Sequence, residues 1–385
     1  MDFTISGDLK DFKDLARQIC EDELKPVVLE LDRKREYPRE FLKLIGKTGF
    51  MGVWIPEEYG GAGCGLFGLA LLAEEIARVC VGTATAYSAI ALGTLPVLLS
   101  GTEAQKQKYL TKVANGEYIA GFALTEASSG TDAFGGMQTK AVRDGDFYII
   151  NGTKQFISNA SQADFYSVFA KTNPNGGPRG VSGFIVDKDT PGLSFGLKLE
   201  KLGLHCSDTR EVVFENCRVP KENLIGGKEG LGIRTVIRTL NKSRVIGGGA
   251  HGVGCAQGAY EEALRYAKNR KLFGKRIIDF QVNQHKFANI ATEIEMARLM
   301  VYEAAWMLDQ NLQEHDAGKY AAMAKCAGSD AAMHTVVEAM QIFAGAGYMD
   351  SLAAKFYRDA KVLQIYEGTN EVQRDEIARN LMREK

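Results

Sequence analysis

The sequence of 385 residues has few cysteines and histidines and almost no net charge. Its seven cysteines are odd in number, widely spread and never paired as C-x-x-C, which argues against a disulfide framework and a structural zinc. Its five histidines never fall at the H-E-x-x-H spacing of zinc enzymes, so we expect no metal site. With 47 basic and 48 acidic residues, no overall field favours nucleic acid or an anionic membrane.

Targeting signals are also missing from the pattern. The segment "MDFTISGDLKDFKDLARQIC" has neither the order of a signal peptide nor the Arg-rich composition of a transit peptide. No uninterrupted apolar run reaches the length of a membrane span. Because the unpaired cysteines suit a reducing compartment, we expect a cytoplasmic protein with no membrane partner; a mature organellar form is the alternative.

Three blocks of different periodicity are present. Apolar residues recur at helical spacing from Asp8 to about position 115, and short alternating runs with turns such as "RDGDFY" follow from Tyr118 to about Pro220. Helical spacing then returns near 229–270, 281–312, 316–344, 352–361 and 370–383. The sequence predicts an α+β fold with a helical domain at 1–117, a β-domain at 118–225 and a helical bundle at 226–385.

One glycine motif imitates a dinucleotide site. "GGGAHG", from Gly247 to Gly252, satisfies G-x-G-x-x-G, but that motif requires a preceding strand. Here it lies inside one helical stretch. We therefore expect these glycines to allow close helix packing.

The segment "QIYEGTNEVQR", from Gln364 to Arg374, places the carboxylate of Glu367 beside a glycine and before a new helix. Asn370 followed by Gln373 is a plausible helix cap, and in that interpretation Glu367 is a solvated turn residue. The alternative, a functional carboxylate, depends on the rest of the chain.

Four further segments decide between these interpretations. They are "FALTEASSGTD" (Phe122–Asp132), "QFISNA" (155–160), "RKLFGKRIIDFQ" (Arg270–Gln281) and "QIFAGAGY" (341–348). With "IYEGTNEVQ", and in this order, the chain resembles the acyl-CoA dehydrogenase family over essentially its whole length. The resemblance implies an N-terminal helical domain, a central β-domain and a C-terminal four-helix bundle. It also implies a homotetramer with FAD in each subunit.

The resemblance assigns residues to the cofactor. Hydroxyls and backbone groups around Thr125 and Thr131 would bind the polar parts of the flavin, Gly130 would permit close approach, Phe156 would cover one flavin face and Ser158 would reach toward N5. The wider cofactor set is Phe122, Leu124, Thr125, Gly130, Thr131, Phe156, Ser158, Arg270, Phe273, Gln281, Gln341, Gly345, Thr369 and Glu371. Within it, Gln341 and Gly345 would come from a neighbouring subunit to grip the adenosine diphosphate part.

The resemblance also makes Glu367 the base that removes the α-proton of an acyl-CoA thioester while the β-hydride leaves to the flavin. Its backbone N–H and a flavin hydroxyl would bind the thioester oxygen, and Gly368 would let substrate pass close by. The neighbours Ile365 and Tyr366 would raise its pKa. Some relatives place the base on the helix that here reads "LNKSR", where Ser243 cannot replace a carboxylate.

Other positions concern the substrate. By the resemblance, Asn241, Arg244 and Thr131 would contact the CoA thioester. The segment from Thr83 to Leu99 matches a helix and loop at the end of the acyl cavity, where Ser88 and Ala91 offer small, uncharged side chains. Packing is the alternative explanation for these small residues. If they line the pocket, we expect a short to medium acyl group, including branched or cyclic forms, and poor use of glutaryl-CoA.

Several alternatives remain open at this stage. The electron acceptor would be an electron-transferring flavoprotein, or oxygen in an acyl-CoA oxidase, and an enoyl-CoA reductase would run the chemistry backward. Phe156 and Ala127 replace a tryptophan and a proline common in relatives, which affects flavin exposure. A non-enzymatic CoA- or flavin-binding scaffold is disfavoured because the carboxylate at 367 is present.

Overall fold

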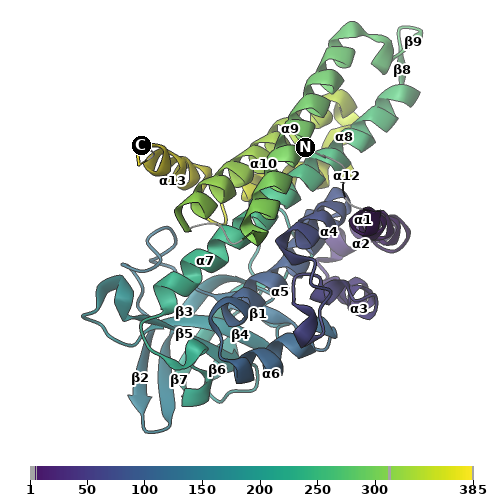
Figure 1. Ribbon diagram of the computed structural model, residues 1–385. Coiled ribbons are helices and arrows are strands. Elements are labelled where there is room, and N and C mark those ends of the chain that lie inside the picture. The colour runs from purple at the N-terminus through teal and green to yellow at the C-terminus, as the bar shows by residue number, and fades with distance from the viewer. Residues whose placement is uncertain (1–4, 6, 311–313, 384–385) are drawn as a thin grey trace.

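The computed structural model describes residue 5 and residues 7–310 and 314–383, in the predicted order of helices, sheet and helices (Figure 1). In the first block α4 and α5 are buried on nearly every side, because their residues are apolar or small all round. The helices of this block are α1 (Gly7–Ile19), a π-helical turn (Cys20–Leu24), α2 (Val28–Lys34), α3 (Arg39–Lys47), α4 (Gly65–Val79), α5 (Val81–Ser100) and α6 (Glu103–Ala114).

Helix α5 is continuous from Val81 to Ser100, so the loop expected within this segment is absent and that expectation was wrong. Gly93 and Pro96 both lie inside the helix. A Cβ on Gly93 would stand 2.7 Å from the backbone of Gly121, so the glycine lets α5 lie directly on the sheet. The helix is long and apolar enough to cross a membrane, but 83% of its most apolar window is buried inside the fold, as in a core helix.

The β-domain is one seven-stranded sheet with the order β1-β4-β2-β3-β7-β6, in which β5 pairs with β4. The hairpin expected at "RDGDFY" is confirmed, because β2 and β3 pair antiparallel around Gly145, whose φ is 59°. The strands are β1 (Ala120–Ala123), β2 (Lys140–Asp144), β3 (Phe147–Ser158), β4 (Phe165–Lys171), β5 (Val181–Asp187), β6 (Leu193–Phe195) and β7 (Thr209–Pro220).

A register shift between β3 and β7 positions residues of the site. It falls between Lys154 and Ile157, where Phe156 has a φ of 59° and keeps 61% of its surface exposed. The backbone N–H of Gln155 donates to the carbonyl of Thr125 at 2.8 Å. Bulges of this kind re-aim side chains, and this one turns Phe156 out of the sheet core.

A buried ion pair lies beside this register shift and the turn at Thr125. The Lys154 ammonium is 2.8 Å from Oε1 of Glu126 and donates to the carbonyl of Leu124 at 2.9 Å. The hydroxyl of Thr139 donates to the same carboxylate at 2.6 Å. A buried charge is tolerated only when it is paired and hydrogen-bonded, so this cluster fixes the turn that begins at Thr125.

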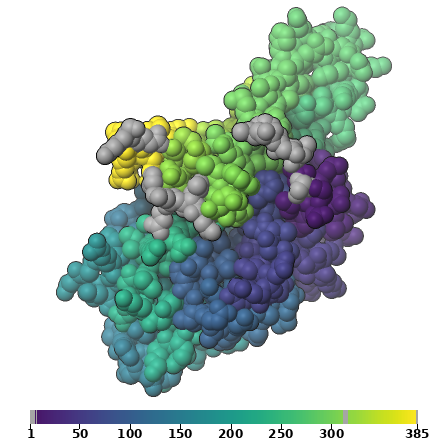
Figure 2. Space-filling view, viewed as in Figure 1, coloured from purple at the N-terminus to yellow at the C-terminus, as the bar shows by residue number. Residues whose placement is uncertain are grey.

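The C-terminal block forms a long helical bundle, and the helices predicted from periodicity are confirmed. Helix α10 packs against α8, α9, α12 and α13. The elements are α7 (Gly232–Arg244), a π-helical turn (Val245–Ala250), α8 (His251–Asn269), the hairpin β8 (Lys271–Leu272) and β9 (Lys275–Arg276), α9 (Gln281–Asp309), α10 (Glu314–Phe343), α11 (Gly345–Tyr348), α12 (Leu352–Leu363) and α13 (Asn370–Leu381). The end that carries the hairpin projects beyond the rest of the molecule (Figures 1 and 2).

The glycine-rich motif lies in this bundle and has no strand before it, which excludes the dinucleotide interpretation. A Cβ on Gly252 would stand 2.2 Å from the backbone of Gly328 on α10. A Cβ on Gly248 would stand 2.2 Å from the side chain of Lys325. The expectation that these glycines allow close helix contact is therefore confirmed.

Candidate active site

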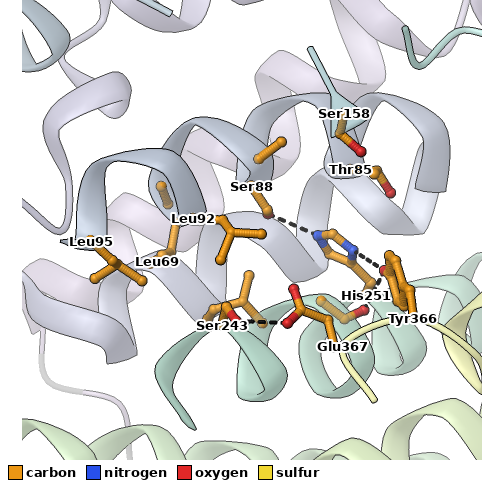
Figure 3. A pocket seen from close by; sticks show the side chains of 14 residues that line it. Leu69, Thr85, Ser88, Leu92, Leu95, Ser158, Ser243, His251, Tyr366 and Glu367 are labelled. Atoms are coloured by element: carbon orange, nitrogen blue, oxygen red, sulfur yellow. Dashed lines mark hydrogen bonds between the residues drawn. The ribbon is translucent and has the colours of Figure 1, made fainter. Parts of the chain in front are cut away.

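The centre of the site is Glu367, in the loop between α12 and α13, with a φ of 59° (Figure 3). The hydroxyl of Ser243 donates to its Oε2 at 2.8 Å. Arg244 Nε donates to its carbonyl at 2.9 Å, and Gln373 Nε2 donates to the same carbonyl at 3.2 Å. Side chains of α7 and α13 thus hold both the main chain and one carboxylate oxygen of Glu367.

Burial raises the pKa of Glu367 above its usual 4.5. The hydrogen bond from Ser243 and the charges of Arg244 and Lys325 act in the opposite direction without cancelling the effect. Of the two apolar neighbours predicted, Tyr366 lines the same cavities as Glu367, whereas Ile365 is 51% exposed and lines a separate hollow. The carboxyl instead lies against the π-helical turn, where a Cβ on Gly247 would stand 3.2 Å from its Oε1.

The helix cap expected at Asn370 was assigned to the wrong residue. Thr369 caps α13, its hydroxyl accepting from the N–H of Val372 at 3.4 Å. Asn370 is buried and receives a hydrogen bond from Lys325 on α10. The Asn370 side chain, which the local sequence pattern assigned to the helix cap, therefore binds α10 instead.

A large cleft opens beside Glu367, with a volume of about 1450 Å³ that includes open solvent. It lies between the β-domain and α7. Eleven of the predicted site residues line it, namely Phe122, Leu124, Thr125, Gly130, Thr131, Phe156, Ser158, Asn241, Arg244, Glu367 and Gly368. The structure therefore brings together most of the residues assigned to the flavin and the thioester.

These residues fit a flavin. The exposed ring of Phe156 gives a flat apolar wall, and the hydroxyls of Thr125, Thr131 and Ser158 provide polar groups along the same cleft. A Cβ on Gly130 would meet nothing within 4 Å, so the loop there is open toward a ligand rather than packed.

A second, smaller cavity of about 450 Å³, open solvent included, adjoins the cleft and shares residues with it, among them Ser158, Tyr366 and Glu367 (Figure 3). Leu69 of α4 and Leu92 and Leu95 of α5 form an apolar part of its wall. Hydroxyl-bearing side chains line much of the rest, namely Thr85, Ser88, Ser158, Ser243 and Tyr366. Ser88 and Ala91 also line it. Glu367 stands at the junction of the two cavities.

Sequence reasoning missed one side chain of this cavity. His251 is buried, and it lies between the Ser88 hydroxyl, 2.9 Å from Nε2, and the Tyr366 hydroxyl, 3.0 Å from Nδ1. Burial lowers the pKa of His251 to about 3. The one available signal is a histidine within a run of glycine and alanine, a run that helix packing alone also explains.

The remaining predicted cofactor residues lie away from the cleft. Arg270, Phe273 and Gln281 sit at the projecting end of the bundle, where Phe273 is 94% exposed at the hairpin tip (Figure 1). Gln341 and Gly345, at the end of α10 and in α11, lie at this same end, as the contact of the Tyr266 and Phe343 rings shows. Thr369 and Glu371 line a separate hollow with Asp330 and Arg374.

Comparison with known proteins agrees with this geometry. The chain matches three family models: the acyl-CoA dehydrogenase N-terminal domain over residues 6–117, the middle domain over 121–217 and the C-terminal domain over 230–382. The chain belongs to the acyl-CoA dehydrogenase family. It is therefore an oxidoreductase, and the fold predicted from its sequence is confirmed.

Curated relatives cover almost the whole chain. An acyl-CoA dehydrogenase of Bacillus subtilis is 42% identical over 370 residues, covering 96% of each protein. A 3-(aryl)acrylate reductase of Clostridium sporogenes is 42% identical over 373 residues, covering 96% of this chain and 97% of the relative.

Solved structures share the fold. The butyryl-CoA dehydrogenase of Megasphaera elsdenii has a TM-score of 0.95 and 39% identity, with full coverage of both chains. A chain in a structure described as the electron transferring flavoprotein of Acidaminococcus fermentans has a TM-score of 0.96 and 44% identity, also with full coverage. Acyl-CoA dehydrogenases are FAD flavoproteins, so FAD is the cofactor of this protein.

Proposed function

We propose that this protein oxidises an acyl-CoA thioester to the 2-enoyl-CoA, with Glu367 as the base that removes the α-proton. The observation that carries the proposal is the place of its carboxyl, at the junction of an apolar cavity and the larger cleft. Ser243 fixes Oε2, and burial raises the pKa of Glu367, which makes its carboxylate a stronger base. FAD supplies the acceptor for the β-hydride.

The protein's own groups would position the substrate. In our proposal the backbone N–H of Glu367 donates to the thioester oxygen and stabilises the charge that develops there. Arg244 Nη1 donates a hydrogen bond to Asn241 Oδ1 at 3.1 Å. Both side chains, together with Thr131, would contact the CoA part of the substrate. Gly368, with a φ of 85°, leaves room for the thioester beside the backbone.

The acyl group would enter the smaller cavity. The residues that line it include no lysine or arginine, and its histidine is neutral, so a free terminal carboxylate would lack a counter-charge and is disfavoured. A short to medium acyl chain, including branched or cyclic forms, suits this space.

An electron-transferring flavoprotein is the proposed electron acceptor, supported by the similarity to the chain from Acidaminococcus fermentans. The similarity to a 3-(aryl)acrylate reductase favours one second candidate, reduction of an enoyl thioester by the same groups in the reverse direction. Oxidase activity is the weaker alternative. A cytoplasmic location stays a proposal, as do the domain limits 1–117, 118–225 and 226–385.

We further propose a homotetramer. Arg270, Phe273 and Gln281 lie at the projecting end of the bundle, far from the cleft of their own chain (Figure 1). They could grip the adenosine diphosphate part of FAD only across a subunit boundary, with Gln341 and Gly345 supplied by a neighbouring subunit. Thr369 and Glu371 would complete the cofactor contacts from the adjoining loop.

The deciding experiment uses Glu367→Gln. This variant should retain FAD and bind acyl-CoA but lose anaerobic flavin reduction by at least ~10²–10⁴-fold, because its sole base is gone. Glu367→Asp, which keeps a carboxylate on a shorter side chain, should fall between Glu367→Gln and wild type. Near-normal flavin reduction by Glu367→Gln would place the base elsewhere and contradict the proposal.

A further inference from the structure

The acyl cavity contains a chain of hydrogen bonds that the proposed dehydrogenation does not need. It runs from Ser88 on α5 through His251 on α8 to Tyr366 (Figure 3). From Tyr366 it continues to the carbonyl of Gly247, where it ends. Apolar side chains stand beside it in the cavity wall, with Leu69, Leu92 and Leu95 among them. Buried polar groups in such surroundings are costly unless their bonds are satisfied, which makes the direction of this chain informative.

The direction follows from its last link. A carbonyl can only accept, so the Tyr366 hydroxyl donates its proton to Gly247 O at 2.6 Å. The Tyr366 oxygen must then accept from His251, which places the ring proton on Nδ1. Because burial keeps His251 neutral, its Nε2 carries a lone pair and accepts from the Ser88 hydroxyl at 2.9 Å.

The hydrogen bond between Ser88 and His251 therefore has a fixed direction, with Ser88 as the donor. The single proton of the Ser88 hydroxyl is committed to His251, and its oxygen offers lone pairs. Ser88 is only half-buried and lines the cavity, so this oxygen is within reach of an acyl chain. The cavity presents a hydrogen-bond acceptor to its ligand.

The π-helical turn Val245–Ala250 makes this arrangement possible. Its wider turn brings the carbonyl of Gly247 to Tyr366 and is followed directly by His251. Single π-helical turns inside α-helices occur frequently at functional sites. The glycines permit the turn to lie against Glu367 and α10, since a Cβ at Gly248 would collide with Lys325.

We propose that the preferred acyl group carries a neutral hydrogen-bond donor, a hydroxyl, beyond its β-carbon, and that Ser88, oriented by His251 and Tyr366, accepts from it. This inference rests on the proposed acyl-CoA dehydrogenation. It extends that function by distinguishing a donor from an acceptor of equal size. A keto group at the same carbon would meet the lone pairs of Ser88 and lose a hydrogen bond.

The test compares three thioesters of nearly equal shape that differ only at one carbon of the acyl chain: a hydroxyl, a keto group or a methyl branch at carbon 4, 5 or 6. Anaerobic flavin reduction by the holoenzyme gives kcat/KM for each. At one of these carbons the wild type should use the hydroxy thioester at least as well as the methyl-branched one. It should use the keto thioester about tenfold or more less well, since an unmade buried hydrogen bond typically costs that factor or more.

Ser88→Ala should lower the ratio of hydroxy to methyl-branched kcat/KM by about tenfold. Thr94→Val is the matched control, because Thr94 lies on the same helix and donates to the carbonyl of Ile90 instead. It should leave the ratio unchanged.

Three results would overturn the inference: a wild type that disfavours the hydroxyl at every carbon, equal use of hydroxy and keto thioesters, or an unchanged ratio in Ser88→Ala. A water bound by Ser88 in place of substrate would give the first of these. Failure of every thioester to reduce the flavin would instead contradict the proposed function, so the two failures are distinct.

Discussion

The hydroxyl of Ser243 lies 2.8 Å from Oε2 of Glu367 and donates to it. Ser243 belongs to α7 and Glu367 to the loop before α13, so residues 124 positions apart form one site. The resemblance to relatives that place their base on this helix gave Ser243 as the alternative position. In this chain the two positions touch, and the serine adjusts the carboxylate rather than replacing it.

This contact predicts a shift in pH dependence. The Ser243 hydrogen bond favours the charged form of Glu367 and opposes the increase in its pKa caused by burial. In Ser243→Ala the pKa of Glu367 should therefore rise further. Because only the carboxylate can take the α-proton, the acidic limb of the kcat/KM profile should move to higher pH.

Thr239→Val provides the control for that shift. Thr239 lies one turn earlier on α7, and its buried hydroxyl has no hydrogen-bond partner among the described residues. This variant should keep the wild-type limb. An unshifted limb in Ser243→Ala would show that Glu367 does not govern the profile.

A second prediction concerns Arg270. If this residue grips FAD across a subunit boundary, Arg270→Ala should lower the FAD content and weaken the tetramer together. Flavin absorbance per chain and the mass in solution by light scattering measure the two effects. Arg276→Ala is the control variant, because Arg276 lies in the β8–β9 hairpin that directly follows Arg270 but pairs with Asp279 at 2.7 Å. Full FAD retention by a monomeric Arg270→Ala variant would contradict the proposed arrangement.

The third prediction tests the buried ion pair of Lys154 and Glu126, which fixes the turn that begins at Thr125. Glu126 has donors besides Lys154, from the Thr139 hydroxyl and from the backbone of Thr139 and Gln138. Among the residues that the structure describes, Lys154 has only the carbonyl of Leu124 in addition. Glu126→Gln should therefore lower the free energy of unfolding by roughly 3–5 kcal/mol, because it leaves a buried ammonium without a counter-charge. Lys154→Met should lower it by less.

Urea unfolding followed by circular dichroism measures both variants of this pair. The double variant Glu126→Gln with Lys154→Met should recover part of the lost stability, since no buried charge remains. FAD content should fall in Glu126→Gln, because the loop at Thr125 lines the cleft. Equal destabilisation by both single substitutions would mean that the surrounding donors do not compensate as the geometry indicates.

The sequence predicted best the features that depend on local periodicity. The long helices α9 and α10 and the β2–β3 hairpin have strong repeating patterns, so their positions could be predicted. Helix α5 could not, because Gly93 and Pro96 indicate a break whereas close packing on Gly121 keeps the chain helical.

The site was predictable where a motif carries the chemistry, and not where tertiary contacts do. Glu367 and the residues of the flavin cleft belong to recognisable segments. His251 enters the cavity only because a π-helical turn precedes it and because α5 supplies Ser88 as its partner. Neither relationship has a signature in the sequence around His251.

The final prediction concerns acyl chain shape. Ala91 is 2% exposed and lines the acyl cavity with Ser88 and Leu92, and the larger side chain of a leucine at this position would occupy part of its volume. Ala91→Leu should therefore reduce kcat/KM for branched and cyclic thioesters by about tenfold or more while largely sparing butyryl-CoA, since overpacking of this size typically costs 1–3 kcal/mol. Flavin reduction by a series of acyl-CoA thioesters measures the effect. The series covers acyl chains of roughly four to eight carbons, the length that the character of the pocket favours. Glutaryl-CoA should be poor in both proteins, because the cavity would bury its carboxylate without a counter-charge. An equal loss for all thioesters, or best activity with glutaryl-CoA, would contradict the assignment of this cavity to the acyl chain and leave the role of Glu367 untouched.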